Sequence, residues 1–194
     1  MNEERQNLTR PTSEQIDKEI KRIWMLQETR KVIWGAVKTL LIFAAAAVLL
    51  SMLLFPVLQV QKGSMNPTLE DGEIIIFLTT AKIHRGDIVA FRYNNQSLIK
   101  RVIAVPGDRI DITDDGIVIL NGMQLNESYI SAPATGDRTV EMPLRVQENH
   151  YFVMGDHRET SIDSRRAEIG PITGDQIVGK AILRLWPLSK LGIP

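Results

Sequence analysis

The sequence is notable first for what it lacks. It contains no cysteine, which excludes disulfides, thiolate nucleophiles and cysteine-ligated zinc but leaves the redox compartment undetermined. Its 194 residues carry 23 basic and 23 acidic side chains, a balance that gives no reason to expect a nucleic-acid partner. There is no internal repeat and no low-complexity stretch. We expect no cofactor and no metal ion.

Charge is also absent from one long apolar run, residues 40–58. The run reaches the roughly 20 residues needed to cross a hydrocarbon core about 30 Å thick. It starts too far into the chain, and is too long, for the apolar region of about 7–15 residues in a cleavable signal peptide. We therefore predict one transmembrane helix over residues 38–58, ended by Pro56.

Basic residues are unevenly distributed around this run. Only Lys62 follows it before Lys82, whereas several lysines and arginines precede it. Those on the N-terminal side include Lys21, Arg22, Arg30, Lys31 and Lys38. The positive-inside rule then places the N-terminus in the cytoplasm and the residues after about 58 outside. The predicted location is the cytoplasmic membrane, with a single pass through the lipid bilayer.

Residues 1–37 form a cytoplasmic segment that the sequence predicts to be helical. Thr12 and Gln15 have the spacing of a helix-capping box. Two i,i+4 ion pairs, Glu14–Lys18 and Asp17–Lys21, favour the helix. It carries an apolar stripe made of Ile16, Ile20, Ile23 and Trp24. Such a helix is either a solvated juxtamembrane helix or an interfacial or partner-binding helix.

Beyond the apolar run the pattern changes to short segments rich in Ile and Val, separated by turn signals such as Pro106-Gly107-Asp108 and Asn121-Gly122. Such a pattern is typical of a mainly β domain, which we place at residues 59–194. The predicted strands are 73–78, 87–92, 98–105, 109–113, 117–120, 151–154 and 177–185. Residues 126–149 contain Pro133, Gly136 and Pro143, and we interpret them as an excursion from the sheet.

Ser64 and Lys100 are the candidate reactive pair. A serine hydroxyl is a weak nucleophile and needs a base within hydrogen-bond reach. Lysine can be that base only when neutral, and burial can lower its pKa far enough below the reference of about 10.4. Lys100 lies in an apolar strand, on the face predicted to carry Leu98 and Val102. Its neighbour Arg101 cannot give up a proton. The alternative is a lysine that extends from an edge strand to solvent.

The three histidines offer a weaker alternative base. His84 precedes a charged turn and His150 opens a strand, so both are interpreted as structural. His157 lies in the polar turn of residues 155–165. Nothing in the sequence pairs it with a carboxylate that would orient it toward Ser64, as a catalytic triad requires.

Three ordered blocks after the apolar run resemble the bacterial type I signal peptidases, which are membrane-bound Ser-Lys endopeptidases. The blocks are Gly63-Ser64-Met65-Asn66-Pro67-Thr68-Leu69, Lys100-Arg101-Val102-Ile103-Ala104-Val105-Pro106-Gly107-Asp108 and the segment 155–165, and Leu185-Trp186-Pro187-Leu188 also fits. The resemblance implies the mainly β fold that these enzymes share with self-cleaving SOS repressors, here as a catalytic domain tethered by one N-terminal transmembrane helix.

The resemblance also implies residue roles. Ser64 would be the acylating nucleophile, Lys100 its general base, and Ser161 a hydrogen-bond partner of the lysine amine. Asp163 and Arg165 would form a structural ion pair, and Met65 would shape the substrate cleft. Two positions depart from the family pattern. His157 stands where Asn is frequent, and Lys62 stands where some members have a serine that donates to the oxyanion hole.

The implied substrates are signal-peptide-bearing preproteins, cut after small residues, with the secretion translocase as a further partner. A strand edge would bind the extended substrate, and the membrane anchor would raise its effective concentration. Two alternatives remain open. One is a Ser-Lys self-cleaving protease of the SOS-repressor type. The other is a non-enzymatic, membrane-anchored β module of an export complex, which would need neither Ser64 nor Lys100.

Overall fold

The computed structural model describes residues 12–194, so the part of the N-terminal prediction that falls on residues 1–11 lies outside the described residues. The chain divides into two compact units, one ending at Leu50 and one running from Ser51 to Pro194. Each unit is considered separately below.

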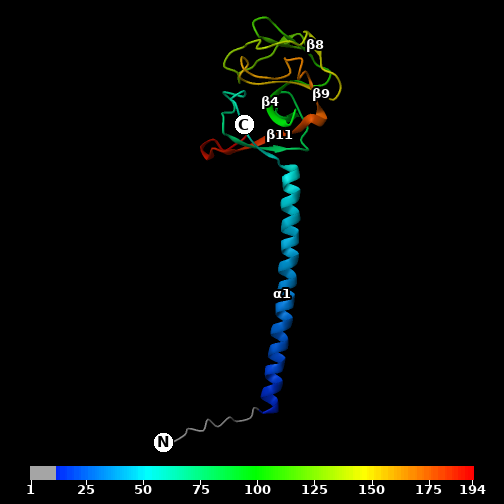
Figure 1. Cartoon of the computed structure of the whole chain (residues 1–194), viewed down its shortest axis with the longest axis vertical. Helices are drawn as coiled ribbons and strands as arrows, with labels where there is room; N and C mark the ends of the chain where they lie inside the picture. The colour runs from blue at the N-terminus through cyan, green and yellow to red at the C-terminus, as the bar shows by residue number, and fades with distance from the viewer. Residues whose placement is uncertain (1–11) are drawn as a thin grey trace. The chain divides into compact units, whose positions relative to one another are not determined.

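One continuous helix, α1 (Ser13–Leu54), accounts for the N-terminal unit (Figure 1). The Gln15 side chain accepts the Thr12 backbone N–H at 3.0 Å, which is one half of the predicted capping box. None of the 42 residues of α1 is buried, although an 18-residue window has a mean hydropathy of 2.3. At 1.5 Å per residue the helix is about 63 Å long, roughly twice a hydrocarbon core of about 30 Å. Its apolar part therefore has the length and exposure of a membrane span.

The end of α1 corrects the predicted boundary at residue 58. The helix stops at Leu54, and residues 57–59 form a strand instead. Pro56 disfavours the helical conformation of the residue before it and brings no N–H of its own, so the helix ends before the proline rather than after it. There is also no break at residue 37, because the helix predicted before it and the predicted span are one element, α1.

A seven-stranded antiparallel sheet forms most of the second unit. In spatial order its strands are β1 (Val57–Gln59), β2 (Ile74–Leu78), β11 (Ile177–Trp186), β3 (Ile88–Tyr93), β4 (Gln96–Ala104), β9 (His150–Met154) and β10 (Ile172–Thr173). The register pairs β9 with β4 only from Arg101 to Ala104. In the described part of the chain, residues 96–100 therefore have no strand on their second edge.

A smaller antiparallel sheet has the order β7 (Met123–Gln124), β6 (Val118–Leu120), β5 (Arg109–Ile112) and β8 (Leu144–Arg145). Two single-turn helices, η1 (Gly174–Gln176) and η2 (Leu188–Lys190), flank β11. Residues 126–143, which include most of the predicted excursion, contain no strand.

The core of the large sheet anchors the loop that follows β1. Val60, Met65 and Leu69 of this loop are at most 3% exposed. They pack against Ile75, Phe77, Ile88, Ala90, Ile99 and Ala181. Burying an apolar side chain of this size stabilises a fold by roughly 1.5–3 kcal/mol, so three such anchors fix a loop that has little regular structure. A separate cluster joins the two sheets, with Ile103 and Phe152 facing Ile110 and Leu120.

The mainly β fold is confirmed, and each of the seven predicted strands is present with ends shifted by at most two residues. The strands that the sequence did not predict are β1, β7, β8 and β10, which are two or three residues long. Segments this short carry too few residues for an alternating pattern to be recognised.

Candidate active site

Ser64 lies on the loop between β1 and β2, which is closed at its base by backbone hydrogen bonds. The Val60 N–H donates to the Glu73 carbonyl at 2.8 Å, and the Gly72 N–H donates to the Val60 carbonyl at 3.0 Å. Lys62 and Gly63 both have left-handed backbones, with φ of 67° and 58°. Glycine adopts this conformation freely, whereas Lys62 is held in it by an N–H that donates to Asp71 Oδ1 at 2.9 Å. This double turn precedes Ser64 directly.

Lys100 reaches Ser64 from β4. Its side chain is 3% exposed, and Nζ donates to Ser64 Oγ at 2.6 Å. The two residues face a cleft of about 530 Å³. The cleft is lined by the loop and by the free edge of β4, with Leu58, Val60, Met65, Leu98 and Ile99 as its apolar residues. The structure therefore brings a hydroxyl and an amine within hydrogen-bond distance beside an open strand edge.

The electrostatics of Lys100 favour a lysine that can lose its proton. Burial is the largest influence and lowers the pKa of Lys100 to about 8. The negative charges of Asp163 and Asp156 act in the opposite direction, and Arg165 adds to the lowering. A base with this pKa is neutral in a useful fraction of molecules near neutral pH.

The turn formed by residues 155–165 packs directly on the Ser64 loop. The His157 N–H donates to the Ser64 carbonyl at 3.1 Å. Gly155 lies so close to that carbonyl and to the Ser161 side chain that a Cβ at this position would overlap both. The close contact explains why a glycine is needed here, since any larger residue would push the nucleophile loop away.

Asp163 and Arg165 form a buried, two-pronged ion pair in the same turn. Arg165 Nε and Nη2 each donate to the Asp163 carboxylate at 2.9 Å, and neither side chain is more than 1% exposed. The Gly155 N–H is a further donor to Asp163, at 2.9 Å. Burial is the largest single influence and would raise the pKa of Asp163, but Arg165, the Gly155 N–H and Ser161 together outweigh it and hold the pKa below its usual range.

The Ser161 hydroxyl does not behave as the resemblance implied. It is buried and has no hydrogen-bond partner among the residues that the structure describes, so the expected hydrogen bond to Lys100 is not formed. Ser161 lies instead against Gly155 and near enough to Asp163 to help lower the pKa of that carboxyl. The hydroxyl is thus beside Asp163 and not on Lys100.

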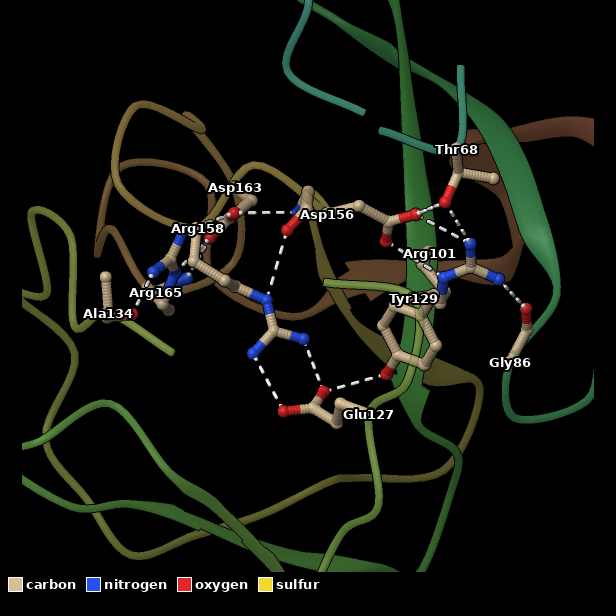
Figure 2. A network of polar contacts seen from close by, with 11 residues as sticks. Thr68, Gly86, Arg101, Glu127, Tyr129, Ala134, Asp156, Arg158, Asp163 and Arg165 are labelled. Atoms are coloured by element: carbon tan, nitrogen blue, oxygen red, sulfur yellow. Dashed lines mark hydrogen bonds and ion pairs between the residues drawn. The ribbon is translucent and has the colours of Figure 1, made fainter. Parts of the chain in front are cut away.

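A second polar network, which the sequence did not predict, lies beside the Asp163–Arg165 pair (Figure 2). Arg101 donates to Asp156 from Nε at 2.9 Å and from Nη2 at 2.6 Å. Thr68, four residues after Ser64, donates its hydroxyl to the same carboxylate. The hydrogen bonds among Arg101, Asp156 and Thr68 therefore join the Ser64 loop, strand β4 that carries Lys100, and the 155–165 turn.

The histidines do not supply a base for Ser64. The His157 ring faces the Thr160 hydroxyl, His150 faces the Glu148 carbonyl, and His84 lies 3.6 Å from Asp87. Within residues 12–194, no three His, Asp or Glu side chains are grouped as a metal site would require. Around Ser64 and Lys100 the structure offers a hydroxyl, an amine and backbone groups.

Comparisons with known proteins show the family to which the chain belongs. The profile of the family described as signal peptidase, peptidase S26, matches residues 33–186. The chain belongs to this family. It is 34% identical over 168 residues to signal peptidase I of Bacillus licheniformis, a match that covers 80% of this chain and 89% of the relative. It is 37% identical over 147 residues to signal peptidase IB of Staphylococcus aureus, covering 66% of this chain and 75% of the relative.

Among solved structures, a signal peptidase I from Enterococcus faecalis V583 matches 52% of this chain and 97% of its own, with 30% identity and a TM-score of 0.42. The membership of the signal peptidase family makes the chain a peptidase and gives no support to the two alternatives, a self-cleaving repressor and a non-enzymatic module.

The residues named from the sequence lie together in the described structure. Ser64, Met65 and Lys100 line one cleft, and Asp163 pairs with Arg165 behind it. The partners that sequence reasoning missed are Thr68, Asp156, Arg158, Glu127 and Tyr129. One available signal was Arg101, because an arginine in an otherwise apolar strand needs a buried anion.

Proposed function

We propose that this member of the signal peptidase family is a serine-type endopeptidase in which Ser64 is the nucleophile and Lys100 the general base. The observation that carries the proposal is the 2.6 Å separation of Lys100 Nζ and Ser64 Oγ. A buried setting that lowers the pKa of Lys100 to about 8 supports it further. A hydroxyl activated by an adjacent neutral amine is the arrangement that nucleophilic catalysis requires.

The reaction runs in two steps through an ester. Neutral Lys100 takes the Ser64 proton while Oγ attacks the substrate carbonyl carbon, and the Ser64 backbone N–H stabilises the developing oxyanion. Lys100 then gives the proton to the leaving amine, which departs as the new N-terminus. In the second step Lys100 takes a proton from water as the water oxygen attacks the ester, and returns it to Ser64 Oγ as the ester bond breaks. The product leaves as a carboxylic acid, which loses its proton to solvent.

The substrate is an extended segment that ends a signal peptide. The unpaired edge of residues 96–100 offers backbone donors and acceptors to one more strand. Apolar residues of the cleft, including Met65 and Ile99, would select small side chains at alternate positions. These features support preproteins cut after small residues as the substrate class.

The domain arrangement that we propose follows the charge bias around the apolar run. Residues 1–37 lie in the cytoplasm, α1 continues through the bilayer to Leu54, and the β-rich catalytic domain lies outside. Enzyme and substrate then share one membrane, which raises their effective concentration. The secretion translocase, which delivers such substrates, is the partner that we expect beside it.

Asp163 and Arg165 support the site without taking part in the chemistry. Replacing Asp163 with Ala leaves the buried guanidinium of Arg165 without its counter-ion, and such a loss typically costs about 3–5 kcal/mol. We expect a clear fall in melting temperature, measured by calorimetry of the protein in detergent. An inactive Asp163→Ala protein that melts like the parent would contradict this scaffold role.

The activity itself is tested by incubating the purified protein with a preprotein whose signal ends in Ala-x-Ala and weighing the products by mass spectrometry. We expect one cut after the second alanine. The Ser64→Ala variant should leave the precursor intact, whereas Ser131→Ala, an exposed serine outside the cleft, should cut normally. Cutting by Ser64→Ala at the parent's rate would exclude the proposed nucleophile.

A further inference from the structure

We propose that Glu127 and Tyr129, in the excursion that follows β7, are positioning residues that hold Arg101 and the 155–165 turn in the arrangement that the Ser64–Lys100 pair needs. This inference rests on the proposed function. Neither residue lines the cleft around Ser64, so each acts through the arginine that it contacts.

Arg101 is the first link of the argument. It follows Lys100 directly in β4 and is 9% exposed. Besides Asp156, its guanidinium donates to the Gly86 carbonyl at 2.8 Å and to Thr68 Oγ1 at 3.2 Å. All of these bonds lie in the plane of the guanidinium, so its two faces must be held by something other than hydrogen bonds.

Tyr129 covers one of those faces. The guanidinium carbon of Arg101 lies 4.2 Å from the centre of the Tyr129 ring, within the range of a cation–π contact. Figure 2 shows the ring beside Arg101, with its hydroxyl turned toward Glu127. Tyr129 donates that hydroxyl to Glu127 Oε1 at 2.7 Å, which fixes the orientation of the ring.

Glu127 extends the contact to the turn. Its carboxylate accepts two hydrogen bonds from Arg158, one of them at 3.0 Å, and the Arg158 side chain is fully buried. Arg158 Nε also donates to the Gly155 carbonyl at 3.1 Å. Gly155 is the residue whose N–H holds Asp163. A short piece of the excursion therefore links the strand of the base to the turn that supports the nucleophile (Figure 2).

The position of Arg101 matters for Lys100 through Asp156. The negative charge of Asp156 raises the pKa of Lys100, and Arg101 offsets that charge by pairing with it. The other charged groups near the amine are Asp163 and Arg165 on the turn and Lys62 on the nucleophile loop, none of which contacts Tyr129. Loosening Arg101 should therefore raise the pKa of Lys100 and leave the other influences unchanged.

The experiment compares Tyr129→Leu with Tyr129→Phe in the full-length enzyme, using pH profiles of kcat/KM and separate kcat and KM values. Tyr129→Leu removes the aromatic face, and we expect kcat to fall about tenfold, the scale of a partly desolvated cation–π contact. We expect KM to stay within about twofold. The acid limb of the kcat/KM profile, which is the pH range over which activity rises as Lys100 loses its proton, should move to higher pH. Tyr129→Phe keeps the ring over the guanidinium but loses the bond to Glu127, so its acid limb should move much less than that of Tyr129→Leu.

A matched control separates positioning from general stability. Tyr93 is a half-buried tyrosine that packs in another cluster, so Tyr93→Leu should lower the melting temperature without moving the acid limb. If Tyr129→Leu does not fold, Tyr129→Met, which fills the space with a flexible chain, takes its place. The proposal is overturned if the variant lowers only the melting temperature, if it changes nothing, or if Tyr129→Phe shifts the limb as Leu does.

Failure of this inference differs visibly from failure of the proposed function. If Ser64 and Lys100 are not the reacting pair, the parent shows no cleavage that depends on these two residues. Its kcat/KM then shows no rise with pH that can be assigned to loss of the Lys100 proton. If only the positioning role is wrong, the parent cuts with its limb in place while the Tyr129 variants behave like Tyr93→Leu.

Discussion

The burial of Lys100 has two opposite consequences, because it suits the lysine to the proposed role of base and also makes it an unfavourable residue for the fold. With a pKa of about 8 in the folded protein and about 10.4 in an unfolded chain, folding must bury a charge at neutral pH. The cost is fully present below pH 8, where the folded lysine is protonated. It disappears as the pH rises toward the unfolded value.

Lys100→Met should therefore be inactive and more stable than the parent. The gap between the two pKa values corresponds to at most about 3 kcal/mol, so we expect the melting temperature to rise by several degrees at pH 7. Near pH 10 the gain should be small. Thermal melts of both proteins at the two pH values test this, and an equal or lower melting temperature of Lys100→Met at pH 7 would contradict it.

The same pKa predicts how the reaction depends on pH. The parent's kcat/KM should rise with pH, reach half of its maximum near pH 8 and level off above that pH, since the free enzyme must lose the Lys100 proton. A His157 base would instead place the limb near 6.5. We expect His157→Ala to keep the parent's limb, since the His157 ring is turned to Thr160. Loss of the limb in His157→Ala, with Lys100→Ala still active, would overturn the Ser-Lys mechanism.

Gly155 shows how one element restrains another. A methyl group at this position would overlap the Ser64 carbonyl and the Ser161 side chain, so Gly155→Ala must displace the nucleophile loop from the turn. A displacement of about 1 Å near the reacting atoms can cost about a hundredfold in rate. We expect a loss of kcat of that order with a smaller change in KM. Steady-state kinetics on a preprotein substrate measures both kcat and KM. An unchanged kcat would show that the 155–165 turn moves while the Ser64 loop stays in place.

The elements differ in how far the sequence could predict them. The long strands were predictable because alternating Ile and Val carry their own signal, and the blocks around Ser64 and Lys100 indicated the reacting pair. The ion pairs of Arg101 with Asp156 and of Arg158 with Glu127 join residues 55 and 31 positions apart. No local pattern encodes such a distance. The hydrogen bond expected for Ser161 was wrong because it depends on the exact path of a turn.

At the scale of the whole molecule, the charge bias around the apolar run predicts the topology. The test uses cells whose outer barrier is permeabilised while the cytoplasmic membrane stays intact. We expect protease added to the medium to digest the chain after about residue 58 and to spare the first 37 residues. A tag at residue 2 and immunoblotting of the fragments give the readout, with lysed cells as the control in which the tag is lost. Loss of the tag in unlysed cells would reverse the orientation.

The free edge of residues 96–100 has one more consequence, which concerns what the enzyme leaves uncut. A partner for that edge must be extended, at about 3.3 Å per residue, whereas a helix rises only 1.5 Å and keeps its backbone groups occupied. The chain's own apolar run contains four consecutive alanines, residues 44–47, yet they lie inside the unbroken helix α1. We therefore expect secondary structure to decide whether small residues are cut. A leader that is extended at its small residues can pair with the free edge and be cleaved, whereas a permanent anchor that is helical there cannot pair with it and stays intact.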